Sequence, residues 1–212
     1  MKSGLERIFK NIVEGSNPIR YNSLVQDRTV LVVIDMVNGF INEGLLISSR
    51  VAAIAPEVIN IVKNCKEIGI PVVAFVDSHP EKCPEFEVYG VHCQEGSREC
   101  EIIDELKAIG GYIVIKKSSS NGFLEPKFQQ WLKSHPSITD YVVIGGCTDI
   151  CILQFCLTLK AHFNRLNRES QIVVPINAVD TYDFGLHQGD LSHIMALNNL
   201  SQNGIKVVTG IL

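Results

Sequence analysis

Residues 29–37 read TVLVVIDMV. This is an apolar run of strand length followed by the acid Asp35. Five further runs follow along the chain: IPVVAFVD from Ile70, GYIVIK from Gly111, DYVVIGG from Asp140, SQIVVPI from Ser170 and GIKVVTG from Gly204. All of them are rich in valine and isoleucine with little polar alternation, which is typical of strands covered on both faces of a parallel sheet. The sequence therefore predicts six buried strands.

Segments with helical spacing lie between these strands. The apolar residues predict helices over four ranges, which are 51–68, 99–109, 149–163 and 187–203. Alternating strands and helices predict an α/β protein with right-handed crossovers, a three-layer, doubly wound, Rossmann-like fold around a six-stranded parallel sheet. The opening residues, MKSGLERIFKNIVEG, have the pattern of an amphipathic helix. We expect one domain over residues 1–212, with residues 1–28 as an N-terminal helical extension.

Composition limits the classes of partner. The chain has 212 residues, 46% of them hydrophobic, and its 19 basic and 23 acidic residues give a net charge of −4. The longest basic run is the pair Lys116 and Lys117, so we expect neither nucleic acid nor a membrane surface as partner. The longest apolar run, residues 29–34, is too short to span a bilayer. A small molecule is the expected ligand.

The seven cysteines are odd in number and irregularly spaced, and no apolar signal segment opens the chain. This usage predicts reduced thiols and a cytoplasmic location. No two cysteines have the CxxC spacing, which disfavours a thiolate zinc site or a thioredoxin motif. There is also no GxGxxG after the first strand and no P-loop, so neither common nucleotide cofactor of this fold class is indicated.

Polar side chains stand where four of the predicted strands end. The first strand is followed by Asp35, the second by Asp77 and His79, the third by the lysine pair, and the fourth by GGCTDIC, residues 145–151. Ligands of open parallel sheets collect at the carboxyl ends of the strands. Each residue alone has an ordinary structural interpretation, as a helix cap, a solvated lysine or a small buried thiol. Together they predict an acid, a base and a thiol at one edge of the sheet.

Cys151 is the best candidate nucleophile among the cysteines. It is expected in the first turn of a helix, where backbone amides and the helix dipole stabilise a thiolate, and Asp149 or Thr148 can cap that helix. The preceding glycine pair permits a tight bend. Such a bend could aim the amides of Cys147 and Cys151 at one point, as an oxyanion hole requires.

A second group consists of Asp77, His79 and His92. Two ligands at one loop mouth and a third thirteen residues on would leave coordination positions open, as in catalytic metal sites. Two surface histidines and a capping aspartate give the same spacing, so from the residues alone both interpretations stay open. The long irregular segment that carries the histidines, about 78–97, is of a length that is usually functional or disordered.

In these motifs the chain resembles the isochorismatase-like cysteine hydrolase superfamily, and within it the nicotinamidases. The resemblance runs from about residue 29 to 212. Its anchors are VVIDMVNGF from Val32, DSH from Asp77, VHCQEGS from Val91, KKSSSNGF from Lys116, GGCTDIC from Gly145 and NAVDTYDFGLH from Asn177.

The resemblance implies a catalytic triad of Asp35, Lys117 and Cys151. Lys117 is chosen over Lys116 because the family's lysine lies six residues before a phenylalanine, here Phe123. It also implies a cis peptide bond between Gly146 and Cys147, next to the expected oxyanion hole.

For the metal, the resemblance implies a site made of Asp77, His79 and His92. Some members add a ligand six residues after the first histidine, which is here Glu85. The implied ion is divalent, with Zn²⁺ first and Fe²⁺ or Mn²⁺ as alternatives. Isochorismatases proper lack this set, so its presence favours nicotinamide as substrate.

Phe40 and Tyr89 occupy positions where the family places the aromatic walls of the substrate pocket. Tyr89 replaces the tryptophan often found there, and Ser97 replaces the usual threonine after the glycine that follows His92.

The expected function is hydrolysis of nicotinamide to nicotinate and ammonia through a cysteine thioester. The alternatives are another amide, a carbamoyl compound or isochorismate as substrate, or a noncatalytic binding protein that kept the fold. The resemblance also implies a homo-oligomer.

Overall fold

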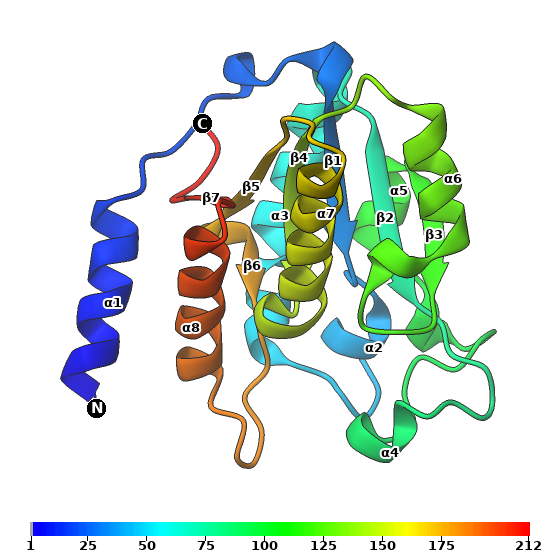
Figure 1. The fold of residues 1–212 in the computed structure, drawn as a ribbon. Helices are drawn as coiled ribbons and strands as arrows, with labels where there is room; N and C mark the ends of the chain where they lie inside the picture. The colour runs from blue at the N-terminus through cyan, green and yellow to red at the C-terminus, as the bar shows by residue number, and fades with distance from the viewer. Residues whose placement is uncertain (1) are drawn as a thin grey trace.

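A single parallel sheet forms the centre of the protein, which we describe from a computed structural model covering residues 2–212 (Figure 1). Its main path runs in the order β3-β2-β1-β4-β5-β7, and a short strand, β6, pairs with β4. The strands are β1 (Thr29–Ile34), β2 (Val72–Asp77), β3 (Ile113–Lys117), β4 (Asp140–Gly146), β5 (Gln171–Pro175), β6 (Val179–Asp180) and β7 (Lys206–Val208). All strand pairs are parallel, so the six-stranded parallel sheet is confirmed. The two residues of β6 were not predicted.

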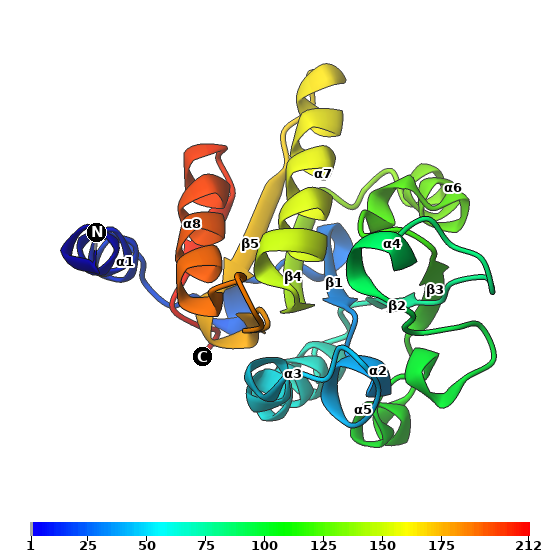
Figure 2. The same ribbon diagram turned by 90° about the horizontal axis from the view of Figure 1, so that it is seen from below.

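Helices cover both faces of this sheet, which gives the predicted three layers (Figure 2). The helices are α1 (Lys2–Glu14), α2 (Asn38–Ile41), α3 (Ser49–Glu67), α4 (Phe86–Tyr89), α5 (Asp104–Ile109), α6 (Pro126–Ser134), α7 (Leu153–Arg165) and α8 (Gly189–Gln202). In Figure 2, α6, α7 and α8 lie on one side of the sheet, and α3 and α5 lie on the other.

The alternation of side chains along β1 shows why both faces are apolar. Val30, Val32 and Ile34 belong to the core shared with α6, α7 and α8, whereas Leu31 and Val33 belong to the core shared with α3 and α5. Because successive residues of a strand point to opposite faces, a strand buried on both faces needs apolar residues at every position. Every residue of β1 is buried, as this requirement predicts, so the carboxyl end of the strand lies inside the molecule.

Two predicted helices have a different form in the structure, and one helix of nine residues was not predicted. The helix predicted over 99–109 is regular only from Asp104, because residues 98–100 form a separate 3₁₀ turn. The helix predicted over 149–163 consists of a π-helical turn, Thr148–Ile152, followed by α7. Helix α6 was not predicted, although Pro126 at its first position is a favourable helix start.

Strand β3 also departs from the prediction of burial on both faces. It lies at the edge of the sheet, and Ile113 and Val114 remain 44% and 46% exposed. Its last residue, Lys117, is nevertheless buried. The apolar composition of a strand thus indicated its existence more reliably than its position in the sheet.

The strand order brings the ends of β3, β2, β1 and β4 next to one another at one edge. Away from this edge, α1 lies beside α8, with Phe9 and Ile12 against the core (Figure 1). Ile19 forms a β-bridge with Ile211, which ties the segment after α1 to the end of the chain. None of the helices within residues 2–212 is long and apolar enough to cross a membrane.

Candidate active site

Lys117 lies at the centre of a buried ion-pair cluster built from three adjacent strands. Register places it beside Asp77, since the last residue of β3 pairs with the last residue of β2. Its Nζ lies 2.6 Å from Asp77 Oδ1 and 2.9 Å from Asp35 Oδ2, with Asp35 directly after β1. All three side chains are almost completely buried. One ammonium therefore serves two carboxylates.

The charges of the cluster follow from this arrangement. Burial opposes the charge of Lys117, but the two carboxylates outweigh it and raise the pKa of Lys117 well above its ordinary value. Burial also opposes ionisation of Asp77, yet Lys117 and the histidines beside it lower the pKa of Asp77 below the usual range. Lys117 is therefore a permanent cation and Asp77 a permanent anion at neutral pH.

Asp35 differs from Asp77 in its environment. Burial raises the pKa of Asp35 to about 6, although Lys117 acts in the opposite direction. Neither carboxylate oxygen of Asp35 accepts a hydrogen bond of regular geometry from the described residues. A carboxylate of this kind, with an oxygen still free to accept, is suited to take and return a proton near neutral pH.

Cys151 lies in the π-helical turn after β4, and its Sγ is 3.7 Å from Lys117 Nζ. Burial raises the pKa of the Cys151 thiol well above its ordinary value, against the influence of Lys117. The expectation that a helix start makes this residue a ready thiolate is therefore wrong. Burial and the nearby carboxylates of Asp35 and Asp77 oppose the thiolate, so the thiol needs a base, and Asp35 is the nearby carboxylate that can act as one.

The turn that carries Cys151 begins at an unusual bend. Gly145 has a φ of +115°, and a Cβ at this position would lie 2.0 Å from the Ile34 carbonyl oxygen, so only glycine fits. The next peptide bond, between Gly146 and Cys147, is cis. The prediction that Asp149 or Thr148 caps the helix is wrong, because no side chain caps this turn. Asp149 instead accepts hydrogen bonds from residues that follow β6.

Asp77, His79 and His92 converge with one potential ligand atom each, all within 4.8 Å of one another. The Nε2 atoms of both histidines lie 3.4 Å from Asp77 Oδ2. His92 donates its Nδ1–H to the Gly90 carbonyl at 2.8 Å, which leaves a lone pair on Nε2. His79 Nε2 is buried and has no hydrogen-bond partner among the described residues. A buried donor set with two free imidazole nitrogens and one carboxylate fits a zinc-type metal ion.

Two further residues border this group. Cys83 Sγ lies 3.3 Å from His79 Nδ1, a contact that the sequence did not indicate. Glu85 lies on the cavity wall, but its Oε1 accepts the Ser120 N–H at 2.9 Å, and its carboxylate is outside the converging set. Its role as an additional ligand stays a prediction.

A cavity of about 270 Å³ has in its wall Asp77, which belongs to both the ion-pair cluster and the candidate metal group, whereas Asp35, Lys117 and His79 do not line it. Cys151, Asp77 and His92 line it together with both predicted aromatic residues, Phe40 and Tyr89. The rings of Phe40 and Tyr89 lie 6.0 and 6.3 Å from the His92 ring. Sequence reasoning assigned no pocket role to several other lining residues. Some lie within motifs quoted above, which are Ser120, Ile150, Tyr182, Asp183 and Phe184, and the others lie outside them, which are Leu45, Leu46, Ile47, Ser48 and Val88.

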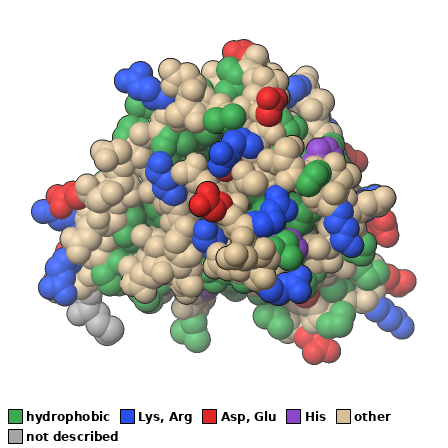
Figure 3. Space-filling model, turned by 45° about the horizontal axis from the view of Figure 1, so that its top comes forward, with side chains coloured by type: hydrophobic (Ala, Val, Ile, Leu, Met, Phe, Trp, Pro, Cys, Tyr) green, Lys and Arg blue, Asp and Glu red, His purple; other side chains and the backbone are tan. Residues whose placement is uncertain are grey.

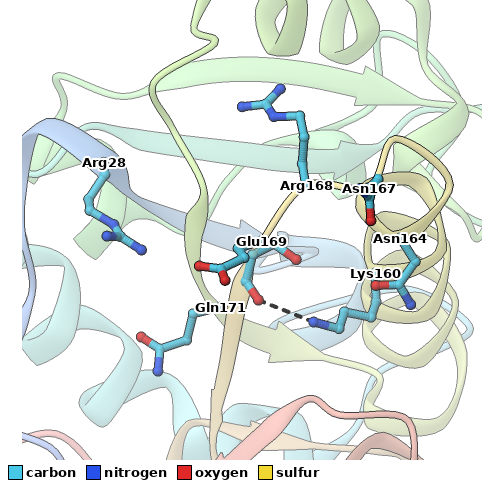
Figure 4. A pocket seen from close by; sticks show the side chains of 8 residues that line it. Arg28, Lys160, Asn164, Asn167, Arg168, Glu169 and Gln171 are labelled. Carbon is cyan, nitrogen blue, oxygen red and sulfur yellow. Dashed lines mark hydrogen bonds between the residues drawn. The ribbon is translucent and has the colours of Figure 1, made fainter.

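A larger hollow of about 650 Å³ lies at the opposite edge of the sheet, near the starts of β1 and β5 (Figure 4). Its three cations are already engaged: Arg28 pairs with Asp140, Lys160 donates to the Ser170 carbonyl and Arg168 donates to the Pro136 carbonyl. Figure 3 shows Lys and Arg side chains scattered among acidic and neutral ones over the top of the molecule. This hollow contains none of the candidate residues.

Comparisons with known proteins show what this chain is similar to. Nicotinamidase 1 of Arabidopsis thaliana is 30% identical over 175 residues, which cover 74% of this chain and 71% of that protein. N-carbamoylsarcosine amidase from Thermoplasma acidophilum has a similar structure, with a TM-score of 0.68 and 27% identity over 85% of this chain and 95% of that one. Pyrazinamidase of Pyrococcus horikoshii in complex with zinc has a TM-score of 0.67 and 21% identity over 85% and 98% of the two chains.

The isochorismatase domain model matches residues 29–210. That range includes the whole sheet and every residue of the candidate site. The chain therefore belongs to the isochorismatase family, as the motifs at its strand ends predicted.

Proposed function

We propose that the protein is a cysteine amidohydrolase that converts a primary carboxamide, with nicotinamide as the first candidate, into a carboxylate and ammonia. One observation carries the proposal. The thiol of Cys151 lies between a buried Asp35–Lys117 pair and a cavity that also exposes a candidate metal group. A nucleophile, its base and a binding pocket are thus combined at one edge of the sheet.

In the first half of the reaction, Asp35 accepts the proton of the Cys151 thiol. The sulfur then attacks the amide carbon of the substrate. Negative charge develops on the amide oxygen, and the backbone amides of Cys147 and Cys151 would bind it. Lys117 keeps Asp35 ionised before this step, because its ammonium lies 2.9 Å from the carboxylate.

In the second half, Asp35 gives the proton to the departing amine, which leaves as ammonia. The acyl group then remains on Cys151 as a thioester. Water, deprotonated by the same carboxylate, attacks the thioester carbon and releases the carboxylic acid and the free thiol. The same residue thus acts as base and acid in turn, which suits its raised pKa of about 6.

Asp77, His79 and His92 would hold the metal ion. When bound, it supplies a Lewis-acid site that can bind the pyridine nitrogen and orient the ring. The zinc complex of the Pyrococcus horikoshii relative supports Zn²⁺ as the first ion to test.

The charges of the cavity support a neutral substrate. Its described lining contains Asp77, Glu85 and Asp183 but neither lysine nor arginine. Isochorismate and N-carbamoylsarcosine both carry carboxylates, whereas nicotinamide is uncharged. Apart from the proposed metal ion, the described wall offers an anion no cationic group to replace its lost hydration. Similarity to the Thermoplasma acidophilum amidase makes a carbamoyl compound the second candidate.

Ammonia release is the direct test. We expect wild-type protein to release ammonia from nicotinamide with a higher kcat/KM than from N-carbamoylsarcosine or other carbamoyl compounds. Cys151→Ala should lower this rate by at least about a thousandfold, because no other group can form the thioester. Cys100→Ser, which changes a cysteine outside the cavity lining, should remain active. An active Cys151→Ala variant would refute the mechanism. A higher kcat/KM for the carbamoyl compound would refute nicotinamide as the substrate and favour the carbamoyl compound.

Metal content is tested separately. Protein purified without added metal should contain about one divalent ion per chain, and His79→Ala should lose it. A chelator should abolish nicotinamide hydrolysis, and zinc should restore it. Full activity in metal-free wild-type protein would contradict the proposed site.

A further inference from the structure

A second group of polar residues lies behind the turn that carries Cys151, outside the proposed machinery. Asp149, in the middle of the turn, accepts a hydrogen bond from Thr181 Oγ1 at 2.5 Å and another from His187 Nε2 at 2.7 Å. Both donors belong to the segment after β6, within the motif NAVDTYDFGLH, which the proposed function leaves unused. The side chains of Asp149 and His187 are only 16% and 21% exposed.

His187 is held on both of its ring nitrogens. Its Nδ1 lies 3.0 Å from the Tyr182 carbonyl oxygen, and its ring stacks on the Tyr182 ring at 3.9 Å with an interplanar angle of 11°. Because a carboxylate only accepts, Nε2 donates the hydrogen bond to Asp149. Charge-assisted bonds of this kind in a partly buried setting fix geometry more firmly than an exposed ion pair.

The neighbouring residue of the turn has its own support. Thr148 is fully buried, and its Oγ1 lies 2.9 Å from Nδ1 of His193 on α8. Burial lowers the pKa of His193, so its Nδ1 can accept a hydrogen bond from the Thr148 hydroxyl. Two successive residues of the turn are thus tied to two different elements.

We propose that Asp149 and His187 are positioning residues that hold the amides of Cys147 and Cys151 where an oxyanion forms. Asp149 lies two residues from each of these amides, so its side chain fixes the middle of the segment that joins them. An oxyanion hole works only if its donors stand in place before the charge develops, and an error of about 1 Å can cost about a hundredfold in rate. The inference rests on the proposed cysteine chemistry and does not depend on the identity of the amide.

Two reactions of the Cys151 sulfur distinguish a misplaced oxyanion hole from a general loss of thiol reactivity. Acylation of Cys151 by p-nitrophenyl acetate forms a thioester and releases p-nitrophenolate, through a tetrahedral oxyanion. Alkylation by iodoacetamide displaces iodide at a saturated carbon and develops no oxyanion. The ratio of the two rates at Cys151, followed by mass spectrometry of its peptide, therefore reports the oxyanion hole alone.

We expect Asp149→Asn and His187→Gln to lower the acylation rate about tenfold to a hundredfold and to change alkylation by less than about threefold. Thr181→Val, which removes one hydroxyl donor, should act in the same direction, and Thr181→Ser should restore the wild-type ratio. Since Asp149 and His187 form one network, the double variant should lose less than the product of the single losses.

Glu169→Gln and His135→Gln change an acid and a histidine outside both groups and serve as matched controls. Unchanged ratios in the three weakening variants would overturn the inference, and so would acylation and alkylation that fall together. Wild-type protein that is alkylated but never acylated at Cys151 would also overturn it. If wild-type protein is acylated but does not hydrolyse nicotinamide, the proposed substrate fails while the ratio still tests the positioning residues.

Discussion

At the scale of single residues, the two carboxylates beside Lys117 have opposite properties. Lys117 and the two histidines outweigh the burial of Asp77, so its pKa falls. At Asp35, burial and the nearby Asp77 outweigh Lys117 and Cys151, and its pKa rises to about 6. The same kind of side chain is therefore a fixed anion in one place and a proton carrier in the other.

This difference predicts the pH dependence of the reaction. Below pH 6, Asp35 becomes protonated and can no longer accept the proton of Cys151. We expect kcat/KM to fall on the acid side with an apparent pKa near 6, approaching a tenfold loss per pH unit. The measurement is the pH profile of kcat/KM between the acid limit of folding and neutrality. A profile that stays flat well below pH 6 would contradict the role of Asp35.

Residue types and their order alone predicted Asp35, a lysine pair and Cys151 at one edge of the sheet. The resemblance to the family was needed to choose Lys117 and to favour the metal interpretation of Asp77, His79 and His92. The contacts among these side chains, and their effects on one another's pKa, were not predictable. Contacts such as that between Lys117 and Asp77 depend on strand register. The protonation of Cys151 was predicted in the wrong direction, since desolvation depends on what packs around the thiol. The role of Asp149 was hidden because its partners lie more than thirty residues further on.

At the scale of elements, the approach of β1 and β4 sets the position of the nucleophile. Gly145 of β4 pairs with Ile34 of β1, immediately before the two chains diverge to Asp35 and the π-helical turn. Apolar runs predicted these strands well, because a strand buried on both faces has no polar alternation to obscure it. Short helices such as α2 and α4, with four residues each, were not predicted because one turn has no period.

The close contact between β1 and β4 predicts that a methyl group added at Gly145 strongly destabilises the fold. Gly145→Ala places a Cβ 2.0 Å from a backbone oxygen that cannot move away, at a positive φ. We expect the free energy of unfolding to fall by more than about 2 kcal/mol. Gly185→Ala is the matched control, because its φ is +59° but nothing lies within 4 Å. Gly185→Ala should lower the free energy of unfolding by about 1 kcal/mol. Equal decreases for the two variants in urea unfolding would refute the steric argument.

At the scale of the whole molecule, the candidate residues lie at the ends of four neighbouring strands, β3, β2, β1 and β4. Asp77 ends β2, while His79 and His92 lie in the segment that connects this strand to α5. An ion held by these three residues would attach the connecting segment, including α4, to the sheet.

Metal binding should therefore stabilise the protein as a whole. At a free zinc concentration about a hundredfold above Kd, the expected gain is about 2.7 kcal/mol, which corresponds to a rise in Tm of about 5 to 10 °C. Thermal unfolding with and without zinc measures this rise, and hydrogen exchange should slow most in residues 78–93. The rise should vanish in His79→Ala and persist in His135→Ala. An equal rise in both variants would place the ion elsewhere.

The acidic lining of the cavity has a consequence for the end of the catalytic cycle. Hydrolysis turns a neutral amide into an anion, and this anion forms among Asp77, Glu85 and Asp183, with no lysine or arginine on the described wall to retain it. Glu85 and Asp183 would repel this anion, whereas the charge of Asp77 is balanced by Lys117 and by the proposed metal ion. Because the amide and the acid would meet the same metal ion, the two unpaired carboxylates would make the acid the weaker ligand, so that accumulating product would inhibit turnover only weakly.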